Sequence, residues 1–127
     1  MNVSSHGEIG IRNGSATVFV TTKQGFGPTG TLVSMNAPLV HRVNLNPDLL
    51  RWVAVEGRSH DLGGVYVIPS GDHGTCELWL GHSFVSDELD RGSLLSALFQ
   101  MLVLSDQLDD LIRDRFGGIR FHDRSEN

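Results

Sequence analysis

Three features are scarce in this 127-residue sequence, and each scarcity excludes a class of protein. The single cysteine, Cys76, rules out an intrachain disulfide and fits a reducing compartment. The longest apolar run, residues 94–104, is interrupted by Ser96 and Gln100 and is too short to span a bilayer. The first ten residues contain neither the basic nor the apolar region of a signal peptide. We therefore expect a cytoplasmic protein without a membrane partner.

Basic charge is also sparse, with 10 Lys and Arg against 15 Asp and Glu and a net charge of -5. Affinity for nucleic acid or anionic lipid depends on clustered Lys and Arg. The densest arginine group, in residues 113–124, is interleaved with aspartates, so we expect no nucleic-acid partner. The composition, 39% hydrophobic and 20% charged, is typical of one globular domain over residues 1–127. Its ordered core is expected at about residues 7–121 because both ends are polar.

The stretch "GFGPTG", residues 25–30, matches the G-x-G-x-x-G pattern of dinucleotide-binding loops. The pattern binds a nucleotide only where a helix opens directly after it, because the helix N-terminus receives the pyrophosphate. Here the run "TLVSMNAPLV" follows, which is typical of a strand, and Pro28 removes one backbone donor. We interpret the motif as a loop between two strands and expect no cofactor.

The spacing of apolar residues predicts five strands and two helices. Alternating or β-branched runs indicate strands, and recurrence every three or four residues indicates helices. Short connections, such as the turn at Asn13-Gly14, favour antiparallel pairing. The order β-β-β-α-β-β-α predicts an α+β fold whose helices pack on one face of an antiparallel sheet. The expected ranges are 8–12, 15–23, 31–40, 46–57, 63–69, 75–85 and 90–118.

Particular residues predict where these elements begin and end. Asn46 followed by Pro47 is typical of a helix start, and Gly117-Gly118 of a helix end. Pro38 cannot donate to a strand ladder, so it indicates an edge, a bulge or the end of its strand.

The long helix is expected to have two different halves. Its first half is apolar on most sides, whereas its second half is amphipathic, with an ion pair four residues apart between Asp109 and Arg113. We expect the carboxylates of this half on the solvated side, where nothing raises a pKa. The solvated side is predicted to contain Asp106, Asp109, Asp110, Arg113 and Asp114.

Histidine and cysteine offer weak candidates for chemistry. His73 and Cys76 have the spacing of a metal-ligand pair, but a structural zinc site needs four ligands. Cys76 with His73 or His82, or a serine with His41 and Asp61, could serve nucleophilic catalysis. However, the sequence has no G-x-S-x-G elbow and no cysteine at a helix start. We therefore predict no metal, no catalytic residue and no enzyme.

Three aromatic residues depart from the alternation of their strands. Phe19, Tyr66 and Trp79 are out of phase with the Val and Leu residues on either side of them. If the helices cover the Val and Leu face, these rings project from the other face. An open face with several aromatic residues is a candidate surface for a peptide or a second subunit. Alternatively, edge packing or loops bury the three rings.

Two stretches of the sequence resemble a known family. Residues 36–54, "NAPLVHRVNLNPDLLRWVA", precede a strand and long helix, residues 80–118, that end in "LDDLIRDRFGG". Together they resemble the YbjN-like domains related to type III secretion chaperones, the peptide-binding TY-Chap group. The resemblance covers roughly residues 30–118 and is most specific in the last helix.

The resemblance implies a twisted antiparallel sheet with helices on one face and a role in binding peptides or partner proteins without catalysis. Secretion chaperones usually dimerise and begin with a helix, whereas about seven polar residues precede the first expected strand here. We expect a bacterial chaperone-like module that binds a peptide or protein client through an exposed sheet face or groove. The alternative is a regulatory or structural homodimerising domain that uses the spare face and the apolar start of the last helix.

Overall fold

The computed structural model describes residues 2–3, 9–13, 16–26, 30–57, 63–70, 74–86 and 91–121. It contains a seven-stranded antiparallel sheet and two helices, which confirms the α+β class and the expected order. The two-residue strands β1 and β7 are additions, because a pair of residues is too short to show a periodicity. The elements are β1 (Asn2–Val3), β2 (Ile9–Asn13), β3 (Ala16–Phe26), β4 (Gly30–Asn44), α1 (Pro47–Val55), β5 (Gly64–Pro69), β6 (Thr75–Ser86), α2 (Arg91–Phe116) and β7 (Ile119–Arg120).

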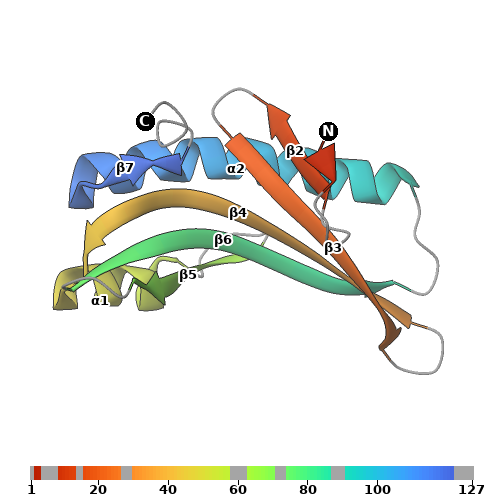
Figure 1. The fold of residues 1–127 in the computed structure, drawn as a ribbon, viewed down its shortest axis with the longest axis horizontal. Helices are drawn as coiled ribbons and strands as arrows, with labels where there is room; N and C mark the ends of the chain where they lie inside the picture. The colour runs from red at the N-terminus through yellow and green to blue at the C-terminus, as the bar shows by residue number, and fades with distance from the viewer. Residues whose placement is uncertain are drawn as a thin grey trace.

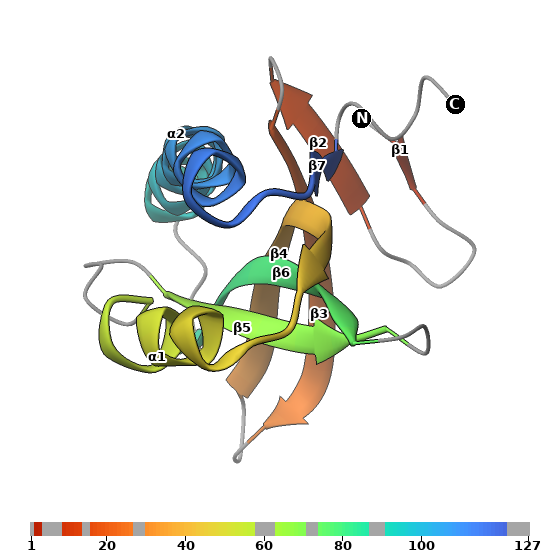
Figure 2. The same cartoon turned by 90° about the vertical axis from the view of Figure 1, so that its left-hand side faces the viewer.

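The sheet is arranged around two long central strands. Its strand order is β1-β2-β3-β4-β6-β5, and β7 pairs with β4 beside this path. In Figure 1, β4 and β6 run side by side as long arcs along the helix α2. Figure 2, at right angles, shows α1 and α2 on the same side of these strands. The opposite side of the central strands therefore has no helix over it in the described part of the chain.

The glycine motif lies between two paired strands, as interpreted from the sequence. Strand β3 ends at Phe26 and β4 begins at Gly30, and these two residues are partners in the antiparallel register. Residues 27–29 lie outside the described part of the chain. Because a strand and not a helix follows the motif, no helix N-terminus is available there for a pyrophosphate.

Pro38 marks a bulge in β4. It faces Trp79 of β6, and the register shifts between Pro38 and Val40. On the other side of β4, the pairing with β3 ends at Asn36, and β7 begins to pair at Val40. Pro38 thus has neither β3 nor β7 as a partner on this side, so both the bulge and the edge apply among the three predicted alternatives. The strand does not end at Pro38, because β4 continues to Asn44.

The predicted helix boundaries are confirmed. The Oδ1 atom of Asn46 accepts a hydrogen bond of 2.9 Å from the N–H of Leu49, and Pro47 occupies the first helical position of α1. Helix α2 ends at Phe116, and the next two residues, Gly117 and Gly118, both have positive φ angles, of 82° and 94°. These angles favour glycine, since other residues suffer a clash of the Cβ atom in this region.

The hydrophobic core lies between the helices and the face of the sheet that they cover. Cys76 belongs to this core, as expected for a small buried thiol. Burial, with the nearby charge of Glu77, raises the pKa of the thiol and keeps it neutral. The largest fully buried side chains are Met35, Leu39, Leu49, Leu78, Leu80, Met101, Ile112, Val18, Val33, Val40, Val43 and Cys76.

Gly118 is predicted to be the less replaceable of the two glycines after α2. A Cβ atom there would lie 2.5 Å from Val40 Cγ1 and 2.7 Å from Val43 Cγ2, whereas a Cβ at Gly117 meets nothing within 4 Å. We expect Gly118→Ala to lower the free energy of unfolding by roughly 3 kcal/mol, from backbone strain plus overpacking. Gly117→Ala, with the strain alone, should cost about 1 kcal/mol. Urea unfolding measures both, and equal losses would contradict the packing argument.

Candidate binding surfaces

The three aromatic residues singled out from the sequence lie on the helix-free face of the sheet. In β6, the side chains of Leu78 and Leu80 are buried in the core, so Trp79 between them points to the opposite face. Tyr66 is the partner of Trp79 in β5. Phe19, in β3, lies on the same face because its neighbours Val18 and Val20 belong to the core.

The rings are in contact with one another and are joined by a fourth. The ring centroids of Tyr66 and Trp79 are 6.5 Å apart with the planes nearly parallel, and those of Trp79 and Phe19 are 6.3 Å apart. Phe121, directly after β7, meets Phe19 edge-on at 6.4 Å. All four side chains are half-buried, so they shield one another only in part. We call Phe121, Phe19, Trp79 and Tyr66 the aromatic row.

The polar atoms of the aromatic row already have partners. The hydroxyl of Tyr66 donates a 2.9 Å hydrogen bond to Asn36 Oδ1, and Trp79 Nε1 donates a 3.0 Å bond to Glu77 Oε1. Burial also raises the pKa of the Tyr66 hydroxyl, which keeps it a neutral donor. Because both donors are occupied, the surfaces of the rings are what the aromatic row presents to a ligand. Such a surface favours apolar and aromatic groups.

A second exposed apolar surface lies on the first half of α2. Leu95, Phe99 and Val103 are 52%, 59% and 41% exposed, and a spacing of four residues aligns them on one side of the helix. We call them the α2 stripe. The sequence between Gly92 and Ser105 contains no charged residue. The sequence shows that this half of the helix is apolar on most sides. Only the packing of α2 against the sheet shows which of these sides remains exposed to solvent.

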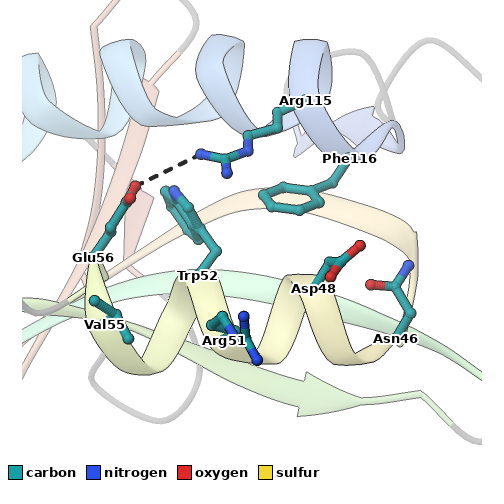
Figure 3. Close-up of a pocket in the computed structure, with 8 residues that line it drawn as sticks. All are labelled: Asn46, Asp48, Arg51, Trp52, Val55, Glu56, Arg115 and Phe116. Atoms are coloured by element: carbon teal, nitrogen blue, oxygen red, sulfur yellow. Dashed lines mark ion pairs between the residues drawn. The ribbon is translucent and has the colours of Figure 1, made fainter.

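A groove lies between α1 and the C-terminal end of α2 (Figure 3). Its volume is about 640 Å³. The Arg115 guanidinium reaches from α2 toward Glu56, at a distance of 3.6 Å, and lies 5.3 Å from the ring centroid of Phe116. Trp52 packs against Phe116 with the centroids 5.7 Å apart. The lining residues are Asn46, Asp48, Arg51, Trp52, Val55, Glu56, Arg115 and Phe116.

This groove is chiefly a joint between the two helices. Trp52, its largest apolar side chain, is only 5% exposed and belongs to the core. The side chains of Arg115 and Glu56 are each 57% exposed, so their ion pair contributes little to stability. Acidic and basic groups of equal number, Asp48 and Glu56 against Arg51 and Arg115, surround the opening. The lining of the groove therefore favours neither a positive nor a negative ligand.

Asp109 departs from the expectation for the charged half of α2. It was expected on the solvated side in an ion pair with Arg113, but it is 3% exposed, and its Oδ1 atom has no hydrogen-bond partner within the described residues. Arg113 instead lies 3.7 Å from Asp110 and 3.5 Å from Asp114. Asp110 also accepts a 2.9 Å hydrogen bond from Arg120. The predicted pair is therefore wrong.

The reason lies in the helical position of Asp109. Ser105, four residues before Asp109, and Ile112, three residues after it, are both buried. Residues at these spacings share one side of a helix, so Asp109 points toward the sheet with them. The sequence alone shows a carboxylate in a charged run, which usually faces water.

The expectation that nothing raises a carboxyl pKa in α2 is also wrong. The pKa of Asp109 is raised from its ordinary value of 3.8 to about 7, chiefly by burial and then by the nearby carboxylates of Asp110 and Asp106. The guanidinium of Arg120 opposes this rise. At neutral pH a large fraction of this carboxyl is therefore protonated.

Within the part of the chain that the structure describes, the other candidates for chemistry are not brought together. Cys76 lies inside the core, while its possible partner His73 and the more distant Asp61 lie outside the described part of the chain. His82 packs against Phe84, with the ring centroids 5.6 Å apart. In the described ranges, no three His, Cys, Asp or Glu side chains gather in a way that could hold a metal ion.

Comparison with known families agrees with this arrangement of sheet and helices. Residues 2–124 match the family described as TY-Chap1, the T3SS (YopN, CesT) and YbjN peptide-binding chaperone 1. The chain belongs to this family, which confirms the resemblance seen in residues 30–118 and extends it over both ends. Searches of curated proteins and of solved structures find no match. Within the described residues, neither helix has the length and apolar character needed to cross a membrane.

Asp109 predicts an unusual dependence of stability on pH. Its folded pKa of about 7 exceeds the ordinary 3.8, so the folded chain retains a proton that the unfolded chain has lost. The contribution of this bound proton to the free energy of unfolding is present in full below pH 4, and it is lost as the pH rises through about 7. We expect Asp109→Asn to be more stable than the wild type by roughly 2 to 4 kcal/mol at pH 8, and nearly equal at pH 4.

Urea unfolding at several pH values between 4 and 8 measures this difference. The control is Asp114→Asn, at a side chain that is 74% exposed, which should change stability by less than about 0.5 kcal/mol throughout. If Asp109→Asn and the wild type show the same pH dependence, Asp109 is not the protonated group.

Proposed function

We propose that this chain is a non-enzymatic, chaperone-like module that binds a peptide or an extended segment of a partner protein on the aromatic row. The observation that carries the proposal is the convergence of four half-buried rings on the helix-free face. They come from β3, β5, β6 and the residue after β7. Membership of a peptide-binding chaperone family supports it.

The physical argument rests on what the rings offer a client. Aromatic side chains supply a large apolar contact area at a low cost in conformational entropy, and they dominate the energetics of many interfaces. Because Tyr66 and Trp79 donate their hydrogen bonds within the protein, binding a client does not require these donors to lose a water partner. The site therefore suits the apolar side chains of an unfolded client segment. It does not select which polar residues the client carries between them.

Selection of peptides from a random display library, followed by titration of the selected peptides, tests this proposal. We expect Trp79→Ala to weaken binding at least tenfold, as removal of a central aromatic residue from an interface commonly does. Thr21→Glu, two residues after Phe19 on the same face, should weaken it as well, because a carboxylate would be desolvated under the client. This second variant adds charge without removing a ring.

The matched control for Thr21→Glu is Phe99→Glu on α2, whose side chain is 59% exposed and lies on the other side of the sheet. It should leave peptide affinity unchanged. The proposal fails if no peptide is selected above background. It also fails if both face variants bind the selected peptides as tightly as the wild type does.

A homodimer is the second candidate, and the α2 stripe favours it. Two copies of α2 that cross antiparallel would place Leu95 of one copy near Val103 of the other, with Phe99 at the centre. A two-fold interface must be complementary to itself, and the absence of charge between residues 92 and 105 avoids like-charge repulsion. The stripe is also the most exposed group of adjacent large apolar side chains on α2 among the described residues.

Light scattering over a range of concentrations tests the dimer. We expect the wild type to be dimeric at high concentration and Phe99→Glu to shift it to a monomer, because the substitution places two carboxylates at the two-fold axis. Trp79→Ala serves as the control and should leave the dimer intact. A wild type that stays monomeric at every concentration would exclude this interface.

A further inference from the structure

The last described residues of the chain bind to the sheet in the manner of an extended ligand. After α2 the chain turns back, and Ile119 and Arg120 pair antiparallel with His41 and Val40 of β4. The next residue, Phe121, brings its ring to the aromatic row. A backbone ladder and one aromatic side chain thus hold three consecutive residues, which we call the C-terminal strap (residues 119–121).

The strap pairs with a length of β4 that β3 leaves without a partner. Strand β3 pairs with β4 only as far as Phe19 opposite Asn36, although β4 continues to Asn44. Beyond the bulge, the side of β4 that β3 has left is available for another extended segment. In the described chain the partner there is the two-residue strand β7.

Among the described residues, the strap is held by a short ladder, an ion pair and a ring contact. Its ladder comprises two residue pairs, and the glycines before it, Gly117 and Gly118, both have positive φ angles. Its charged anchor is the hydrogen bond from Arg120 to Asp110, whose side chains are 23% and 48% exposed. An ion pair of this exposure and a ladder of this length contribute only modestly, so a competing segment could displace the strap.

We propose that the C-terminal strap is an internal substitute for the client, which deepens the proposed function and rests on it. The client is then an extended segment with the chemistry of Ile119-Arg120-Phe121: an aliphatic residue, a basic residue and an aromatic residue in succession. Its backbone pairs with β4 beyond the bulge, its basic side chain meets Asp110 of α2, and its aromatic ring takes the place of Phe121 against Phe19.

The electrostatics of α2 agree with a basic residue in the client. Asp106, Asp110 and Asp114 are carboxylates of the same half of α2, and the whole chain carries a net charge of -5. Arg120 lowers the pKa of the buried Asp109, so a positive charge at this position also offsets the carboxylates around it. An acidic residue in the client at this position would add to the repulsion.

A direct test measures whether loosening the strap opens the site. The probe is a labelled synthetic peptide with the sequence Gly-Gly-Ile-Arg-Phe, which copies residues 117–121, and its binding to the full chain is followed by fluorescence anisotropy. We expect Phe121→Ala to bind the probe about tenfold more tightly than the wild type, because self-occupation reduces the apparent affinity in proportion to the open fraction. Arg120→Gln removes the charged anchor of the strap, leaves Asp110 with Arg113 as its partner and accessible to the arginine of the probe, and should show the same direction of change.

Two controls give the test its specificity. Leu50→Ala removes an apolar side chain that is 46% exposed on α1, away from the strap, and should bind the probe as the wild type does. A second peptide, Gly-Gly-Ile-Arg-Ala, lacks the aromatic ring and should bind every form of the chain about tenfold more weakly than the first peptide does.

The possible outcomes separate this inference from the proposed function. If both strap variants bind the probe no more tightly than the wild type, while library-selected peptides still bind, the strap is not a substitute for the client and the proposed function stands. Equal affinity for the two peptides also overturns the inference, since the aromatic position is then not recognised. If no peptide binds any form of the chain, the proposed function fails together with the inference.

Discussion

The pairing of β4 with β6 is the constraint on which the rest of the structure depends. The ladder runs from Thr31 opposite Ser86 to Asn44 opposite Thr75, nearly the full length of both strands. Because side chains alternate across a sheet, this one register places the Val and Leu residues under the helices and Trp79 on the other side. A shift of the register by one residue would exchange the two faces. The hydrophobic core and the aromatic row are therefore consequences of the same pairing.

The bulge at Pro38–Val40 links that ladder to the candidate site. It faces Trp79 directly and lies where β3 has left β4 and β7 has not yet begun. A bulge bends its strand and increases the local twist. This geometry leaves a length of β4 that the chain covers with its own last described residues. The family is described as peptide-binding chaperones, and this part of β4 is where the chain's own extended segment, β7, is paired.

Much of the fold could be predicted because its signals are local. Asn46 caps α1 and the glycines end α2, as the sequence predicts, since caps and positive φ angles depend on single residues. The expected position of Phe19, Tyr66 and Trp79 on one face follows from alternation, which is also local. Their role in binding is still a prediction. Phe121 could not be associated with them, because a two-residue strand has no periodicity and the partner of β7 is about 80 residues away in the sequence.

The sequence by itself determined seven of the nine elements, their order, the antiparallel α+β class and the family, because each of these depends on residue types and spacings along the chain. Only the tertiary structure decided which charged residue is buried and which apolar surface is exposed. Asp109 and Phe99 show where prediction from the local sequence pattern fails. Asp109 is a carboxylate in a charged run and is buried, whereas Phe99 is a phenylalanine in an apolar run and is 59% exposed. The side of a helix that meets the sheet is selected by the packing of the whole core, and a local pattern that is apolar on most sides does not specify it.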